Sequence, residues 1–176
     1  MKEELIVHFA HPAYQFGSCL ELRGVPLNFI ETRTQEETSA RIGEGNVLVI
    51  TGFWDNAYIE KGANLRFIQA CGAGYNQFDI DAMASKGLRF ANASGVNVNA
   101  VSDHAIALML GLVRKIHLAR DNQHAKYWRG MISEITQREA ELAGKTLIIF
   151  GMGAIGSRLA RLARAFGMNV IGIRRN

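Results

Sequence analysis

Only two of the 176 residues are cysteines, and the sequence lacks any apolar run approaching the roughly 20 residues that cross a bilayer. Neither Cys19 nor Cys71 lies in a C-x-x-C or metal-type spacing, so a disulfide framework and a cysteine-based metal site are excluded. The start, MKEELIVHFAH, is too acidic and too briefly apolar for a secretory signal peptide. These absences predict a reduced, cytoplasmic protein without a membrane segment.

Basic residues are in excess, with a net charge of +4, but they do not form the pattern of a nucleic-acid surface. Such a surface interleaves basic with aromatic residues. Beyond Gly156 only Phe166 accompanies the basic side chains, and we therefore expect no nucleic-acid partner. The basic residues of this stretch are Arg158, Arg161, Arg164, Arg174 and Arg175.

The first half of the chain alternates short apolar runs with helical patterns. The runs predicted as strands are residues 4–10, 26–31, 46–51, 65–71 and 88–92. The helices predicted between them are residues 14–22, 35–42, 55–61 and 79–86. Continuous apolar strands joined by helices are typical of a parallel sheet covered on both faces. We therefore predict an α/β protein whose first domain, residues 1–96, is flavodoxin-like, with ligands at the carboxyl ends of its strands.

The second part of the chain has a different order of elements. Residues 99–120 predict one long amphipathic helix, with Asn99 as its N-cap. A strand (145–150), a helix (155–166) and a strand (169–173) follow. Residues 97–176 are therefore predicted to hold an interdomain helix and the first βαβ unit of a Rossmann domain, which would be incomplete at Asn176.

A glycine pattern joins the strand and the helix of this unit. Gly151, Gly153 and Gly156 match G-x-G-x-x-G, in the strand–helix–strand context that a dinucleotide site requires. The first glycine permits the tight turn, the second lets the backbone approach a pyrophosphate, and the third allows close packing of helix on strand. The helix N-terminus adds a partial positive charge. The alternative is an ordinary glycine-rich βα turn.

The residue expected to bind the adenosine ribose is basic in this sequence. An NAD site usually has Asp or Glu after the second strand, and Arg174 lies 18 residues after Gly156, followed by Arg175. A guanidinium binds a 2′-phosphate that a carboxylate would repel. The pattern favours NADP over NAD as the cofactor. The alternative is a pair of solvent-facing arginines beside an NAD site that tolerates them.

A second glycine-rich stretch, CGAGYNQFD, follows the fourth predicted strand. Gly72, Ala73 and Gly74 would present backbone N–H groups at the carboxyl end of that strand, which suits a small carboxylate. On these residues alone, a plain turn is the preferred interpretation.

Several motifs in order resemble one family. LRFIQACGAGYNQFDIDAMASKGLRFANASGVNVNAVSDHAIALML, then Trp128, then LAGKTLIIFGMGAIG are similar to the D-isomer-specific 2-hydroxyacid dehydrogenases, in particular their D-3-phosphoglycerate and hydroxypyruvate/glyoxylate branches. The likeness extends from Val47 to Arg175. It implies an oxidoreductase that reduces a small 2-oxo acid with NAD(P)H, or runs the reverse reaction. It also implies a flavodoxin-like substrate domain facing a Rossmann domain, and a homodimer.

The resemblance assigns residues to both sites. Substrate-binding residues would be Gly72, Ala73 and Gly74. Cofactor-binding residues would be Met152, Gly153, Ala154 and Ile155, within the motif of Gly151, Gly153 and Gly156. Arg174 and Arg175 are added as cofactor-binding residues from their position after the second strand.

Matches and departures also occur at the crossing between the domains. Asn92 and Asn97 match asparagines of the first crossing, and Asp103 stands where the family usually has Glu. Ser94 replaces a common proline, which leaves the stiffness of the hinge open. Arg174 replaces the usual Asp, which leaves the cofactor open.

No catalytic residue is predicted within the chain. Hydride transfer to a 2-oxo acid requires a cation at the carboxylate and an acid for the developing alkoxide. The resemblance places that Arg, a Glu and the acid–base His beyond residue 176, so we expect the 176 residues alone to be inactive. The five histidines are predicted to be packed or surface residues, and His8 with His11 lacks a third metal ligand: His8, His11, His104, His117 and His124.

Two alternatives to this enzyme remain open. One is a non-catalytic module, either cofactor-sensing or co-repressor-like, or a fragment that needs a partner chain. The other is an unrelated Rossmann dehydrogenase, against which the preceding α/β domain argues.

Overall fold

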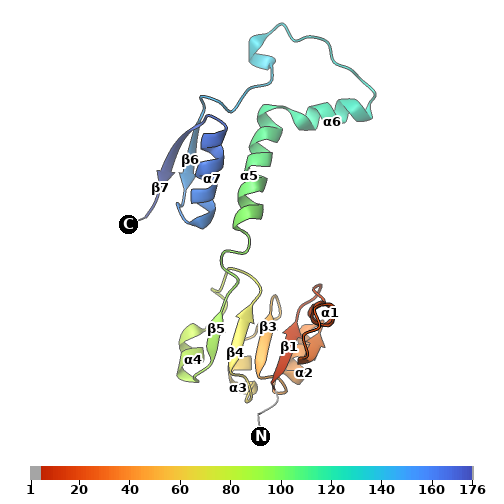
Figure 1. Ribbon diagram of the computed structural model, residues 1–176, viewed down its shortest axis with the longest axis vertical. Helices are drawn as coiled ribbons and strands as arrows, with labels where there is room; N and C mark the ends of the chain where they lie inside the picture. Colours follow the sequence, from red (N-terminus) through yellow and green to blue (C-terminus); the bar gives the residue numbers. More distant parts are fainter. Residues whose placement is uncertain (1–4, 176) are drawn as a thin grey trace. The chain divides into compact units, whose positions relative to one another are not determined.

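The computed structural model describes residues 5–175, and the chain forms two compact units that divide between Ser94 and Gly95 (Figure 1). Among the described residues, no helix combines the length and the hydrophobicity needed to cross a membrane.

The first unit is built on a five-stranded parallel sheet. Its strands are β1 (Ile6–Ala10), β2 (Asn28–Thr32), β3 (Val47–Ile50), β4 (Phe67–Ala70) and β5 (Arg89–Ala91). Their order in space is β2-β1-β3-β4-β5, which confirms the flavodoxin-like prediction. Because the chain turns to opposite sides after β1 and β3, the switch point of the sheet lies between these two strands.

Short helices connect these strands: α1 (Phe16–Leu22), α2 (Gln35–Arg41), α3 (Tyr58–Lys61) and α4 (Ile80–Ser85). Two begin with side-chain caps. The Thr34 side chain accepts the Glu37 N–H at 3.2 Å, and the Asp79 side chain accepts the Ala82 N–H at 2.9 Å. Such caps satisfy N–H groups that have no acceptor inside the helix.

The second unit contains α5 (Val98–Val113), α6 (Ile116–His124), a 3₁₀ turn η1 (Ile135–Gln137), β6 (Thr146–Phe150), α7 (Ala154–Ala165) and β7 (Asn169–Ile173). Strands β6 and β7 pair in parallel, with Phe150 opposite Ile173. A small core of Leu142, Ala163 and Met168 is packed against apolar side chains of α5 and of both strands. Helix α7 thus lies against α5 within this unit (Figure 1).

The prediction of one continuous helix over residues 99–120 is wrong. Helix α5 ends at Val113, and Lys115 has a positive φ of 51° before α6 begins. The Val113 carbonyl accepts the N–H of Ala140 at 2.8 Å, and the Lys115 ammonium donates to the Gln137 carbonyl. Contacts with a distant segment therefore end this helix.

Asn99 as N-cap is also wrong. The helix starts one residue earlier, at Val98, and its N-cap is Asn97, which makes no side-chain capping bond.

Candidate functional site

The loop between β6 and α7 is shaped by its glycines. Gly151 has a φ of +100°, a conformation that L side chains rarely adopt. Its N–H donates to the Ile173 carbonyl at 2.8 Å, so the loop starts tied to the end of β7. At Gly156 an added Cβ would lie 2.1 Å from the Gly151 carbonyl oxygen. The turn therefore depends on glycine at both positions.

The start of α7 presents free backbone donors. Gly153 is its N-cap, no side chain caps it, and its first turn holds no acidic residue. The first N–H groups of a helix have no intrahelical acceptor, and the helix dipole makes this end partly positive. Nothing lies within 4 Å of the position that a Cβ of Gly153 would take. The loop therefore has the donors and the open space that a phosphate group needs.

An open cavity of about 760 Å³ lies at this loop. It is lined by Phe150, Gly151, Met152, Gly153, Ala154, Ile173, Arg174 and Arg175. Two predicted cofactor residues are not in the lining. Gly156 is buried beneath the turn, and the Ile155 side chain is 40% exposed elsewhere. The glycine motif did not predict Phe150 and Ile173 as lining residues. Each is the last residue of its strand beside the loop, and this position could have indicated them.

The electrostatics of this cavity favour an anion. Arg174 and Arg175 line it directly after β7, and no Asp or Glu side chain of residues 5–175 is in its lining. The guanidinium groups of Arg174 and Arg175, the dipole of α7 and the amides at its start would together attract a negatively charged group.

An ion pair holds α7 against α5. The Arg158 guanidinium bonds to the Asp103 carboxylate, to the buried Ser102 hydroxyl and, at 3.4 Å, to the Asn99 carbonyl. Asp103 of α5 is thus bonded to the helix that follows the glycine loop. An ion pair this exposed contributes about 1 kcal/mol or less to stability.

The loop after β4 is the second candidate site. Ala73 and Gly74 are exposed, and their N–H groups donate no hydrogen bond within residues 5–175. The Asn92 amide donates to the Ala73 carbonyl at 2.8 Å, and the Gly72 carbonyl accepts the N–H of Ala93 at 3.0 Å. Because its carbonyls are bound in this way, the loop has its amides available to a small anion.

The histidines do not form a catalytic or metal cluster. His8 is fully buried and His11 is almost buried, whereas His104, His117 and His124 belong to α5 and α6. Over residues 5–175, no group of three or more His, Cys, Asp or Glu side chains is arranged to hold a metal ion. Both cysteines of the chain are free.

Fold and loop geometry define the chain as a two-unit α/β protein with a Rossmann-type βαβ unit. Residues 106–176 match the model of the D-isomer specific 2-hydroxyacid dehydrogenase NAD binding domain. The chain belongs to the D-isomer-specific 2-hydroxyacid dehydrogenase family, as its motifs predicted.

Individual relatives agree with this. A D-3-phosphoglycerate dehydrogenase of Methanocaldococcus jannaschii is 34% identical over 141 residues, 79% of this chain and 26% of that protein. A hydroxypyruvate reductase of Thermotoga maritima is 36% identical over 113 residues, 64% of this chain and 36% of that protein. The crystal structure of a glyoxylate reductase from Paecilomyes thermophila superposes with a TM-score of 0.77 at 27% identity, covering 100% of this chain and 57% of its own. The chain thus spans between 21% and 37% of the length of the curated relatives that it matches.

Proposed function

We propose that the protein containing this chain is an NAD(P)-dependent oxidoreductase that interconverts a small 2-oxo acid and the D-2-hydroxy acid. The observation that carries the proposal is the turn after β6. Gly151 has a positive φ, Gly156 has no room for a side chain, and an uncapped helix opens onto a cavity that no Asp or Glu side chain of residues 5–175 lines. This donor set fits the pyrophosphate of a dinucleotide.

Each part of the site has a role in this proposal. The amides at the start of α7 would bind the pyrophosphate, and Gly153 would let the backbone approach it. The ion pair between Arg158 of α7 and Asp103 of α5 would keep α7 in position. The bound nicotinamide would supply or accept the hydride.

The substrate would be bound by backbone groups of the first unit. The amides of Gly72, Ala73 and Gly74 suit a carboxylate, and Asn92 keeps their loop in shape. The names of the relatives suggest three-carbon acids with an oxygen on the third carbon, as in hydroxypyruvate and phosphoglycerate.

For the cofactor we propose a preference for NADP(H). Arg174 and Arg175 line the cavity where an NAD site has a carboxylate. Calorimetric titrations of the protein with NADPH and with NADH, which give the two dissociation constants, test this preference. Tighter binding of NADH would refute the preference, and binding of neither would count against the whole dinucleotide site.

We further propose that the catalytic Arg, Glu and His lie outside residues 1–176. The 176-residue chain would then show no reduction of glyoxylate or hydroxypyruvate with either cofactor. Turnover by this chain at rates normal for a dehydrogenase would refute that. The alternative of a cofactor-sensing module would gain support if the full-length protein bound dinucleotide but lacked turnover.

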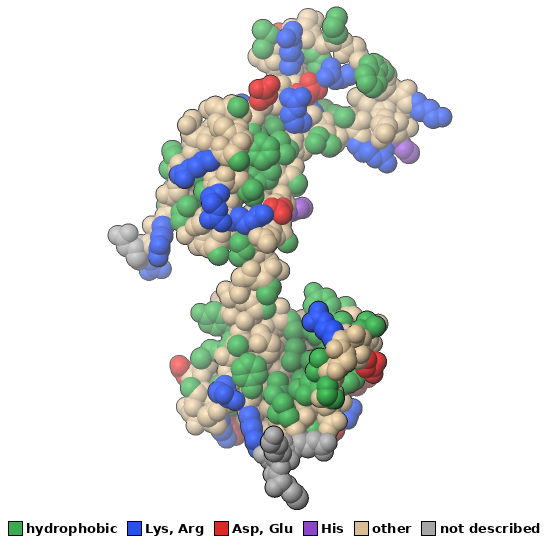
Figure 2. Space-filling model, in the orientation of Figure 1, with side chains coloured by type: hydrophobic (Ala, Val, Ile, Leu, Met, Phe, Trp, Pro, Cys, Tyr) green, Lys and Arg blue, Asp and Glu red, His purple; other side chains and the backbone are tan. Residues whose placement is uncertain are grey.

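We propose a homodimer that forms through α6 and the loop after it. Hydrophobic side chains (green) are exposed among Lys and Arg (blue) in this region (Figure 2). Trp128 is 95% exposed and Met131 is fully exposed, and Ile116 borders the same cavity of about 910 Å³. Apolar residues at this density on one surface indicate a protein contact. Leu108 and Leu112 of α5 are also exposed and would extend the contact.

A further inference from the structure

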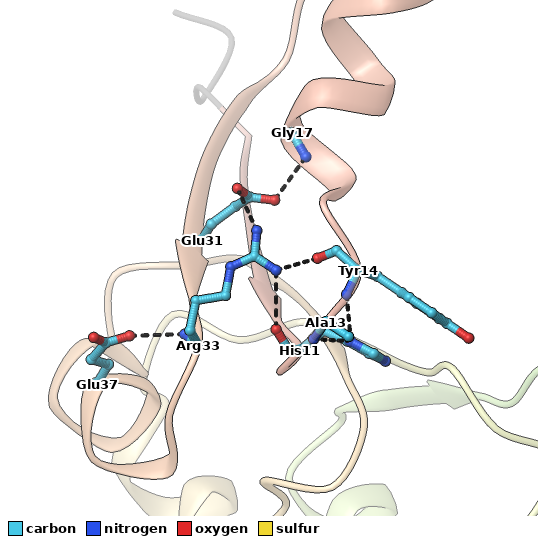
Figure 3. Close-up of polar contacts among 7 residues, drawn as sticks. All are labelled: His11, Ala13, Tyr14, Gly17, Glu31, Arg33 and Glu37. Carbon is cyan, nitrogen blue, oxygen red and sulfur yellow. Dashed lines mark hydrogen bonds and ion pairs between the residues drawn. The ribbon is translucent and has the colours of Figure 1, made fainter.

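His11 follows β1 directly, and its ring is held in one orientation. The side chain is 7% exposed, and its ring stacks on Tyr14 with 3.9 Å between centroids and 6° between planes. Its Nδ1 accepts the N–H groups of Ala13 at 3.0 Å and of Tyr14 at 2.8 Å (Figure 3). Because two donors point at Nδ1, the ring proton is on Nε2.

The backbone around His11 is fixed from β2. Arg33 donates to the carbonyls of His11, at 3.3 Å, and of Tyr14 (Figure 3). Glu31 pairs with this guanidinium at 3.3 Å and also accepts the Gly17 N–H at 2.8 Å. The charge of Arg33 is therefore already compensated, and its role is to hold the loop.

The second nitrogen of His11 has no part in this loop. Accepting two backbone N–H groups requires only one acceptor atom, which Asn or Asp supplies in similar turns. Nε2 has no partner within residues 5–175. It also keeps contact with solvent, because His8 Nδ1 is the one buried, unpartnered side-chain nitrogen or oxygen of that range. Burial and the nearby Arg33 lower the pKa of His11, which favours the neutral form of the ring.

This free donor lies at the switch point of the sheet. Ala10, Ile50 and Ala70 form one row across β1, β3 and β4, so His11 and Cys71 each follow the end of a strand on either side of β3. Two strand spacings separate their backbones by about 10 Å. Gly52 follows β3 between them, and a Cβ added to it would have no neighbouring atom within 4 Å. A side chain added at Gly52 would therefore meet no atom, and the Gly72–Gly74 loop and the loop of His11 lie at the same edge of the sheet.

We propose that His11 is a specificity-determining residue whose Nε2–H donates to the oxygen on the third carbon of a three-carbon 2-oxo acid. This inference rests on the proposed function, in which the amides of Gly72–Gly74 bind the carboxylate of the same ligand. The third-carbon oxygen belongs either to a hydroxyl group or to a phosphate ester.

The test uses the full-length protein that contains this chain, labelled with ¹⁵N-histidine and titrated with pyruvate, hydroxypyruvate and 3-phosphohydroxypyruvate in NMR experiments. We expect the His11 Nε2 resonance to shift with the second and third ligands and not with pyruvate. His11→Asn retains an acceptor for the loop N–H groups and removes the donor. It should weaken hydroxypyruvate about fivefold and the phosphate ester tenfold or more, while pyruvate changes less than twofold. His124→Asn, on an exposed residue of α6, is the matched control and should change none of the three.

Different outcomes refute different parts. If His11→Asn leaves all three affinities unchanged, or weakens all three equally, His11 does not recognise the third carbon, whereas the carboxylate site stands. If the phosphate ester alone responds, the hydroxyl is excluded as the group that His11 recognises. If the full-length protein does not bind pyruvate, the Gly72–Gly74 site and the proposed function fail, and this inference fails with them.

Discussion

His8 should make the stability of the first unit depend on pH. Its ring is fully buried in β1, and hydrogen bonds determine its tautomer. The Thr38 hydroxyl donates to the Thr34 carbonyl at 2.7 Å, so Thr32 must donate to Thr38 at 2.8 Å. His8 Nε2–H therefore donates to Thr32 at 2.9 Å, and Nδ1 is a buried acceptor without a partner. Protonation would add a buried charge at Nδ1.

The size of the effect follows from the pKa. Burial, reinforced by Arg41, lowers the pKa of His8 from 6.5 to about 4. Between these values the unfolded chain binds more protons than the folded one, so stability is full above pH 6.5 and declines as the pH falls toward 4. At 1.36 kcal/mol per pKa unit, the loss is about 2 kcal/mol at pH 5 and about 3 kcal/mol at pH 4.

The measurement is urea unfolding between pH 7 and pH 4.5, followed by the fluorescence of Trp54, which packs against Phe78 in the first unit. His8→Gln is the matched variant, because its amide can still donate to Thr32 but does not titrate. Its loss of stability between pH 7 and pH 5 should be smaller than that of the parent by about 2 kcal/mol. Parallel curves for the two proteins would refute the reasoning, as would a His8 pKa near 6.5 by NMR.

Three other substitutions test the second unit. Gly156→Ala places a Cβ 2.1 Å from the Gly151 carbonyl oxygen, and it should destabilise the protein by about 1–3 kcal/mol and weaken dinucleotide binding. The control Gly111→Ala, in an open part of α5, should raise the melting temperature. Equal effects of the two substitutions on stability would contradict this. Arg174→Ser should weaken NADPH at least tenfold relative to NADH in calorimetry, and Arg161→Ser, exposed on α7, should not; an unchanged ratio would dismiss the NADP(H) preference. Trp128→Ser should convert a dimer to monomer in light scattering, and a parent that is monomeric at micromolar concentration would refute the proposed contact.

Local signals in the sequence were sufficient for most of the fold. Each strand of the first unit is a short apolar run between polar turns, and the observed strands lie within one or two residues of those predicted. The glycine turn was also predictable, since Gly151 and Gly156 are required by the backbone itself. Such features are encoded within a few residues of where they occur.

Features that depend on distant contacts were not predictable. The break at Lys115 involves the Gln137 carbonyl and the Ala140 N–H, both more than 20 positions away from the groups that they bind. Helix α1 begins at Phe16 and not at Tyr14, and the N–H groups of Ala13 and Tyr14 ahead of it donate to His11 Nδ1. Asn92 matched a position of the family, but nothing in the sequence around it indicated that its side-chain amide donates to the Ala73 carbonyl.

Both proposed sites would bind an anion through backbone amides, and this has a consequence for selectivity. The amides of Gly72–Gly74 would accept any carboxylate, and those at the start of α7 would accept any pyrophosphate, since an N–H group distinguishes ligands only by their charge and position. Discrimination must therefore come from side chains beside these amides. Arg174 is such a side chain at the second loop, and His11, with one unsatisfied donor, is such a side chain near the first. Substitution of Arg174 should therefore change which cofactor is preferred, and substitution of His11 should change which acid is preferred. Binding of the shared pyrophosphate and carboxylate groups should change little.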